Sequence, residues 1–217
     1  MTDYAFIRAN MVENQLRPNR IDDPRVLQTM ADVPRERFVP DALRRCAYGD
    51  EDLALGNGDF LIEPLALGKL LQTASPRPRD AVLLLGDATG YVAAVLSRLA
   101  GSVFLLLPHD VALEPMQARL SGLDPSNVTL VHGAAGEGLP GRGPFDLILL
   151  AGSVPGIPPA LLDQLGEGGR LVAVVEHGRS GKVTLARKVN GAVGRLTPFD
   201  AQIHRLPGFL AEPAFSF

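Results

Sequence analysis

Short, continuous apolar runs separated by longer amphipathic stretches dominate the chain after Asp80. The runs that predict strands span residues 82–85, 103–107, 128–131, 145–150 and 170–175. Between them, residues 91–100, 111–122 and 158–165 are long enough to form crossover helices. Strands that are apolar along their whole length are buried on both faces. The pattern therefore predicts a parallel sheet covered by helices on both sides.

The pattern changes at both ends of this region. Residues 182–189 and 194–197 have β-like composition, and the Asn190-Gly191 pair between them is a strong hairpin signal. Residues 1–50 show apolar positions at helical spacing, and Asp23-Pro24 reads as a helix N-cap followed by proline. Residues 49–64 are expected to form a loop. The predicted fold class is α/β, with a mostly parallel twisted sheet, antiparallel strands near the C-terminus and an N-terminal helical extension.

Two regions follow from this reading, a helical one at residues 1–79 and a core at residues 80–217, and we expect them to form one compact unit. The Ser75-Pro-Arg-Pro-Arg79 segment marks the boundary. The last twelve residues, 206–217, are apolar and aromatic. We expect them to pack on the surface of the domain, with a homodimer contact as the alternative.

Composition narrows the class of protein. The chain has 46% apolar and 21% charged residues and a net charge of −3, which argues against a nucleic-acid partner. The N-terminus does not read as a signal peptide, and the apolar runs are too short to span a bilayer. The single cysteine allows no internal disulfide, and the four histidines lack ligand spacing, so no metal is expected. These features favour a cytoplasmic protein.

The turn Gly86-Asp87-Ala88-Thr89-Gly90 joins the first predicted strand of the core to its first helix. Such a turn aims backbone N–H groups at a point where nucleotide-like ligands commonly bind. A dinucleotide site would require G-x-G-x-x-G and an acid at the end of the next strand. Ala88 and Leu107 stand at these positions, so an NAD site has little support. His109 and Asp110 follow Leu107, where they form either a substitute polar group or an ordinary surface loop.

The order of motifs resembles the protein-L-isoaspartate O-methyltransferase family, from about residue 9 to residue 176. The resemblance rests on residues 11–16 (Met-Val-Glu-Asn-Gln-Leu), 21–27, 33–40 (Val-Pro-Arg-Glu-Arg-Phe-Val-Pro), 82–96 and 168–172 (Gly-Gly-Arg-Leu-Val). It implies a Rossmann-like fold and S-adenosylmethionine as cofactor. It also implies a protein or peptide substrate whose isoaspartyl carboxylate is methylated as a step in repair.

The resemblance assigns site residues by position. The family's substrate loop, Gly-Gln-Thr-Ile-Ser-Gln-Pro, corresponds to residues 58–64, which places Ile62 at the serine position and makes Asp59 and Glu63 the neighbouring candidates for catalysis. Leu107 takes the place of the acid that binds the ribose, and Ala134 and Ala135 follow the next strand where the family has the acid that faces the adenine. The candidate cofactor-binding residues are Gly86, Asp87, Ala88, Gly90, Leu107, Ala134 and Ala135.

These departures leave three functional readings. A hydrogen bond to a charged group contributes about 1.5–3 kcal/mol, so loss of two carboxylates costs roughly 3–6 kcal/mol, or about two to four decades in cofactor affinity. The first reading is a working methyltransferase with an altered site. The second is a non-catalytic binding or regulatory homologue, a pseudoenzyme that has lost its cofactor. The third is an enzyme for a positively charged ligand, which would use Asp59, Glu63 and Asp87.

Overall fold

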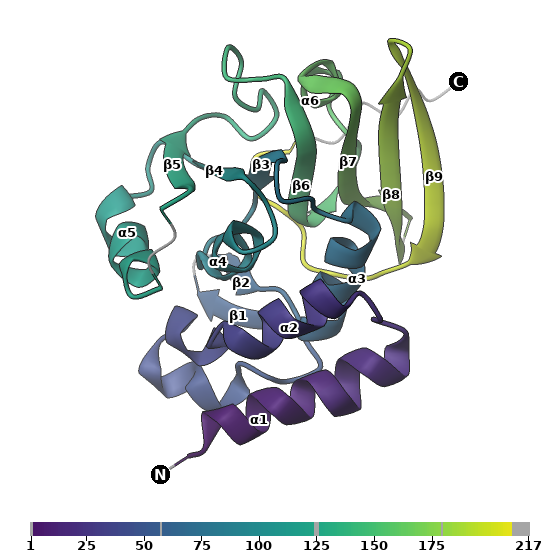
Figure 1. Ribbon diagram of the computed structural model, residues 1–217. Coiled ribbons are helices and arrows are strands. Elements are labelled where there is room, and N and C mark those ends of the chain that lie inside the picture. The colour runs from purple at the N-terminus through teal and green to yellow at the C-terminus, as the bar shows by residue number, and fades with distance from the viewer. Residues whose placement is uncertain (1, 57, 124–125, 179, 210–217) are drawn as a thin grey trace.

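A seven-stranded sheet with the order β5-β4-β3-β6-β7-β8-β9 forms the centre of the molecule (Figure 1). The computed structural model describes residues 2–56, 58–123, 126–178 and 180–209. The pairs among β5, β4, β3, β6 and β7 are parallel, and β8 and β9 are antiparallel. This confirms the predicted sheet. The strands are β3 (Ala81–Leu85), β4 (Ser102–Leu107), β5 (Val128–His132), β6 (Phe145–Val154), β7 (Leu165–His177), β8 (Ser180–Val189) and β9 (Ala192–Asp200).

The strand order reverses next to β3. The chain steps outward from β3 to β4 and β5, and then returns to the other side of β3 as β6. In open α/β sheets, ligands bind at the carboxyl ends of the strands beside such a reversal. The topology therefore points to the ends of β3, β4 and β6 as the place to look for a site.

Alternate residues of the central strands enter two separate apolar clusters. Val82 and Leu84 of β3 join the cluster that contains helices α3 (Pro64–Ala74) and α4 (Tyr91–Ser97). Leu83 and Leu85 join the cluster on the opposite face, which includes Leu161 of the short helix α6 (Pro159–Asp163). Helix α5 (Leu113–Ser121) contributes Met116 and Leu120 to the first cluster. Both faces are thus covered, as predicted.

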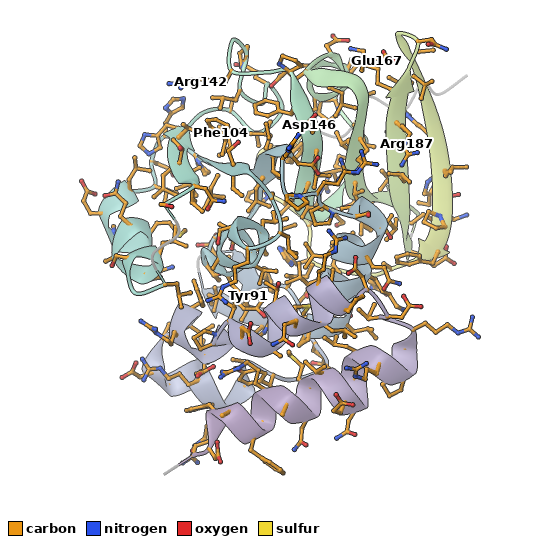
Figure 2. The ribbon with its side chains drawn as sticks, viewed as in Figure 1. Tyr91, Phe104, Arg142, Asp146, Glu167 and Arg187 are labelled. Carbon is orange, nitrogen blue, oxygen red and sulfur yellow. The ribbon has the colours of Figure 1, made fainter. Side chains whose placement is uncertain are left out.

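The N-terminal residues form a helical layer beside α3 (Figure 1). Its elements are α1 (Tyr4–Met11), the π-helical turn η1 (Val12–Leu16), α2 (Pro24–Asp32) and the 3₁₀ turns η2 (Arg17–Asn19), η3 (Arg35–Phe38) and η4 (Asp41–Cys46). The Asp23 side chain accepts a hydrogen bond from the backbone N–H of Arg25 at 2.9 Å, which confirms the predicted N-cap. Figure 2 shows Tyr91 beside this layer, where its ring lies edge-on to that of Phe38 at 5.5 Å.

A buried ion pair connects the sheet to α3. Arg170 Nη2 and Asp80 Oδ2 lie 2.6 Å apart, with both side chains less than a tenth exposed. The same guanidinium donates to the carbonyl oxygens of Ser75 at 2.6 Å and Asp146 at 3.0 Å. Arg170 therefore joins the end of α3 to β6 and β7.

Two predicted segments differ in the structure. Residues 49–64 are more than a loop, because they contain a small hairpin made of β1 (Leu53–Gly56) and β2 (Asp59–Leu61). The C-terminal hairpin is confirmed but its strands are longer than predicted, with Asn190 and Gly191 at φ 52° and 75° in the turn. No helix in the part of the chain described is long and apolar enough to cross a membrane. The cytoplasmic location and the homodimer stay predictions.

Candidate functional site

A cavity of about 100 Å³ lies at the carboxyl ends of β3, β4 and β5, where the topology points. Its walls are mainly apolar, and Asp59 and Asp87 are the acidic residues in its lining. The lining residues are Asp59, Leu85, Gly86, Asp87, Ala88, Leu106, Leu107, Pro108, Val111, Gly133, Ala135, Leu206, Pro207 and Phe209.

The turn after β3 is held together by the carboxylate of Asp87. Its Oδ1 accepts hydrogen bonds from the Gly90 N–H and the Thr89 hydroxyl, both at 2.8 Å, and from the Thr89 N–H at 3.2 Å. Its Oδ2 accepts one from the Ala93 N–H at 2.8 Å. Gly86 and Gly90 have φ values of 85° and 86°, which a glycine adopts without strain. The N–H groups of Thr89, Gly90 and Ala93 therefore bind Asp87 and are not free for a ligand.

Asp87 is fully buried in this arrangement. Burial raises the pKa of its carboxyl above the ordinary value, and the hydrogen bonds from Ala93, Thr89 and Gly90 act in the opposite direction. The side chain of Arg119, on α5, reaches the same turn and donates to the carbonyl oxygens of Ala88 at 3.4 Å and Thr89 at 3.3 Å. Asp87 thus binds N–H groups at the start of α4, whose N-cap residue is Gly90, and it also lines the cavity.

Apolar or small side chains occupy the positions beside β4 and β5 where a nucleoside would need polar partners. Leu107 ends β4 with 3% of its surface exposed, and its carbonyl accepts a hydrogen bond from the Gly133 N–H at 3.0 Å. Ala135 lines the cavity and Ala134 is exposed beside it. Asp110 is exposed and is not part of the lining, so it does not replace the missing carboxylate.

Residues 203–209 cross the ends of the strands and close one side of the cavity. The Leu206 side chain is 3% exposed and lies so close to two glycines that a Cβ on Gly86 would sit 2.4 Å from its Cδ2, and one on Gly152 2.3 Å from it. Ser153 donates to the His204 carbonyl and accepts from the Leu206 N–H, both at 2.8 Å. Residues 206–209 pack against the domain as predicted, with Leu206 and Phe209 buried and Pro207 and Gly208 exposed; residues 210–217 lie outside those described.

The segment that corresponds to the family's substrate loop lies next to the cavity. Ile62 is 2% exposed and is absent from the lining, and its carbonyl accepts a hydrogen bond from the buried guanidinium of Arg35. Arg35 also donates to the carbonyl of Ala47 and stacks over the Tyr91 ring at 4.9 Å. The backbone carbonyl of Ile62 is therefore already hydrogen-bonded, and its apolar side chain carries no reactive group.

The two acids of this loop are partly shielded from water. Burial raises the pKa of Glu63, and the nearby charges of Asp52 and Asp50 raise it further. Burial also raises the pKa of Asp59, while Arg119 and His204 lower it. An anionic ligand at this edge of the cavity would meet the carboxylates of Asp59 and Glu63, so the local charge favours a neutral or positive ligand.

The structure brings together six of the ten predicted site residues around one cavity, namely Asp59, Gly86, Asp87, Ala88, Leu107 and Ala135. Ile62, Glu63, Gly90 and Ala134 lie nearby but do not line it. Sequence reasoning did not identify Leu206, Pro207 and Phe209 as lining residues. Their signal was the apolar run that follows the last strand. In the described residues, no three His, Cys, Asp or Glu side chains form a group that could hold a metal ion.

A doubly wound sheet with an antiparallel edge, and a cavity at the ends of its first parallel strands, defines the Rossmann-like methyltransferase class. A family model described as "Protein-L-isoaspartate(D-aspartate) O-methyltransferase (PCMT)" matches residues 8–197. This chain belongs to that family, whose cofactor is S-adenosylmethionine and whose substrates are proteins with isoaspartyl residues.

Relatives and solved structures agree with this assignment. The chain is 38% identical to protein-L-isoaspartate O-methyltransferase of Koribacter versatilis over 208 residues, which cover 96% of this chain and 94% of the relative. It is 42% identical to the Methylorubrum extorquens protein of the same name, over 85% and 80% of the two chains. A Plasmodium falciparum protein named for the same activity, crystallised with S-adenosyl-L-homocysteine, has a TM-score of 0.78 and 18% identity over 95% and 99% of the two chains. This last likeness shows the fold.

The residues of the cavity do not fit the family's cofactor. Pockets that enclose drug-sized ligands have volumes of about 300–1,000 Å³, whereas this cavity has about 100 Å³. Of its two acidic residues, Asp87 is bound to the start of α4 and Asp59 comes from the loop side. The position that would bind the ribose carries Leu107.

Proposed function

We propose that this chain is a non-catalytic member of the family, which binds a polypeptide partner and has lost methyl transfer to isoaspartyl residues. The observation that carries the proposal is the small cleft at the cofactor position: about 100 Å³ of mainly apolar cavity, with its buried carboxylate bound to the start of α4. A protein keeps its fold after such losses because the fold depends on the core, whereas activity depends on the site.

Affinity arithmetic supports the loss of the cofactor. Two absent carboxylate anchors account for roughly 3–6 kcal/mol, which takes a micromolar dissociation constant to about 0.1–10 mM. Asp87 does not offset this loss, because its oxygens already accept hydrogen bonds from Thr89, Gly90 and Ala93. Leu206 fills the space above Gly86, which lowers the affinity for the cofactor further.

The residues of the substrate loop argue against methyl transfer and favour retained binding of a polypeptide. Ile62 supplies no hydroxyl, and Asp59 and Glu63 place negative charge where an isoaspartyl carboxylate would approach. The loop itself is well held, because Asp52 accepts a hydrogen bond from the Glu63 N–H at 2.8 Å and Arg35 binds the carbonyl of Ile62. An ordered loop that lacks the family's hydroxyl and carries two acids suits recognition of a polypeptide better than methylation of its carboxylate.

A second candidate is a protein carboxyl methyltransferase with an altered site. One observation favours it: the cavity keeps the position beside β3 and β4 at which this class of fold binds its ligand. Such chemistry requires few protein groups, since an ionised carboxylate is already a nucleophile and the protein mainly aligns the reactants.

Methyl transfer from labelled S-adenosylmethionine to an isoaspartyl peptide separates the two candidates. The Koribacter versatilis relative serves as the positive control, and the variant Ile62→Ser restores the hydroxyl that the family has at this position. We expect no methyl ester above background from the wild type or the variant, because the cleft holds no cofactor. Methyl ester formation by the wild type, or its appearance in Ile62→Ser, would overturn the proposal and support the second candidate.

A further inference from the structure

The cavity beside β3 and β4 has one acidic residue on its buried side and another at its mouth. Asp87 is 4% exposed and lies on the turn after β3. Asp59 is exposed on the substrate loop, at the open side of the cavity. Within the described chain, the lining contains no lysine, arginine or histidine. The cavity therefore has the charge of a site for a cationic group.

The buried carboxylate of Asp87 has hydrogen-bond donors but no counter-ion. Its donors are the N–H groups of Thr89, Gly90 and Ala93 and the Thr89 hydroxyl, all of them neutral. None of the ion pairs formed by the described residues includes Asp87. Buried charges in proteins are normally paired. Because Oδ2 accepts only the hydrogen bond from Ala93, it keeps a lone pair for a cationic donor.

The cations nearest to Asp59 are held by other groups. The charges of Arg119 and His204 lower the pKa of Asp59, against the larger effect of burial, but neither side chain lines the cavity. Arg119 donates to two backbone carbonyls of the turn after β3, and the His204 ring lies against Asp52. A cation that enters the cavity would therefore meet both lining acids without breaking an existing ion pair.

The volume of the cavity limits the size of the ligand. A water-sized group needs about 10–15 Å³, so a cavity of about 100 Å³ holds on the order of seven such groups. A lysine side chain, an ammonium on a four-carbon stem, is within this limit. Lysine buries its stem along apolar surface while its ammonium reaches polar partners. Leu106, Leu107 and Val111 supply the apolar surface.

We propose that the cavity binds a lysine side chain of the polypeptide partner, with the stem between the apolar walls and the ammonium at Asp87. This inference rests on the proposed function, because it names the residue by which that partner is recognised. At the rim, Val111 is 37% exposed, and the exposed Pro108 and Pro207 offer further apolar contacts to the residues beside the lysine. Arginine fits less well, because its planar guanidinium carries five donors and the walls offer few acceptors.

A titration followed by two-dimensional NMR tests the lysine site. The probes are acetylated and amidated Gly-Lys-Gly and the same peptide with norleucine, which keeps the stem and lacks the ammonium. We expect the lysine peptide to shift the amide signals of Gly86, Ala88 and Leu107 with a dissociation constant on the order of 1 mM, because it buries few atoms. The norleucine peptide should bind at least about tenfold more weakly, because it makes no charge-assisted hydrogen bond.

Two matched pairs of variants locate the bound lysine. Ala135→Leu fills the cavity and should abolish the shifts, whereas Ala134→Leu, at the exposed neighbour outside the lining, should leave them unchanged. Asp59→Asn removes the charge at the mouth and should weaken binding by about two- to fivefold. Asp50→Asn, at an exposed acid outside the lining, should leave binding nearly unchanged. The pKa of Asp87, which burial raises, should fall when the lysine peptide binds, because an opposite charge favours the ionised carboxylate.

Equal binding of the lysine and norleucine peptides would overturn the lysine site. The same conclusion follows from undiminished binding by Ala135→Leu, or from no binding of the lysine peptide at about ten times the expected dissociation constant. Equal binding of the corresponding arginine peptide would show that the choice of lysine is wrong. These outcomes are separate from the proposed function, which fails if the methyl transfer assay yields a methyl ester. Absence of both methyl transfer and lysine binding would remove only the lysine site.

Discussion

Asp87 offers the sharpest test of whether the turn after β3 serves the fold or a ligand. Substitution of Asp87 by alanine removes the acceptor for three backbone N–H groups, those of Thr89, Gly90 and Ala93, and for the Thr89 hydroxyl. Asp87 is 4% exposed, so water cannot easily replace the lost carboxylate. The perturbation therefore leaves donors unpaired in the interior at the start of α4.

The structure sets the expected magnitude. A buried donor without a partner costs about 1–3 kcal/mol, so the two 2.8 Å bonds from Gly90 and Ala93 together represent roughly 2–6 kcal/mol. Removal of a buried carboxyl whose pKa is raised by burial recovers part of this cost. We expect a net loss of about 3 kcal/mol, and at about 2–4 °C per kcal/mol for a chain of this size the Tm should fall by roughly 6–12 °C.

Urea and thermal unfolding followed by circular dichroism measure this loss. Asp87→Asn keeps an oxygen for the bonds at Oδ1 but loses the one from Ala93, so its stability should lie between those of the wild type and Asp87→Ala. Asp163→Ala, at an exposed acid at the end of α6, is the control and should change stability by less than about 0.5 kcal/mol. A loss below about 1 kcal/mol in Asp87→Ala would refute the reasoning, because a buried acceptor with these contacts contributes more.

Three further outcomes follow from single residues. Asp80→Asn leaves the buried Arg170 guanidinium without its carboxylate and should cost about 3–5 kcal/mol in urea unfolding. Glu63→Gln should raise the Tm at pH 7 but not near pH 4, because burial and the charges of Asp52 and Asp50 raise the pKa of Glu63, so its ionised form destabilises the folded state. Burial pushes the pKa of Asp52 upward, but hydrogen bonds from His204 and Glu63 outweigh this and hold it below its usual value. The stability that Asp52 contributes is present above about pH 4 and is lost as the pH falls through the folded-state pKa. In an acid titration, the free energy of unfolding of Asp52→Asn should therefore fall less steeply with decreasing pH than that of the wild type.

The sheet could be predicted because each strand is specified by its own residues and not by contacts with distant ones. Each parallel strand is a short apolar run between glycine or proline positions, and the Asn190-Gly191 pair fixes the hairpin. Strands β6 and β7 are longer than predicted because their pairing continues through glycines such as Gly152 and Gly169, which read as strand ends in the sequence. The β1–β2 hairpin was missed because its strands have only four and three residues.

The site was only partly predictable. Asp87 stands four residues before α4 begins at Tyr91, outside the N-cap position, so its hydrogen bonds with the Gly90 and Ala93 N–H groups could not be read from spacing alone. The contact of Leu206 with Gly86 and Gly152 could not be predicted, because these residues are far apart in the sequence. Nothing local to residue 206 specifies those neighbours, and only the folded sheet brings them together.

A calorimetric titration of the wild-type protein with S-adenosylhomocysteine tests the central claim most directly. The account predicts no saturable binding below about 0.1 mM, because Leu107 and the alanines after β5 supply no anchors and Leu206 occupies the cleft. A dissociation constant in the low micromolar range would contradict it, and would mean that other groups of this chain hold the adenosyl cofactor firmly.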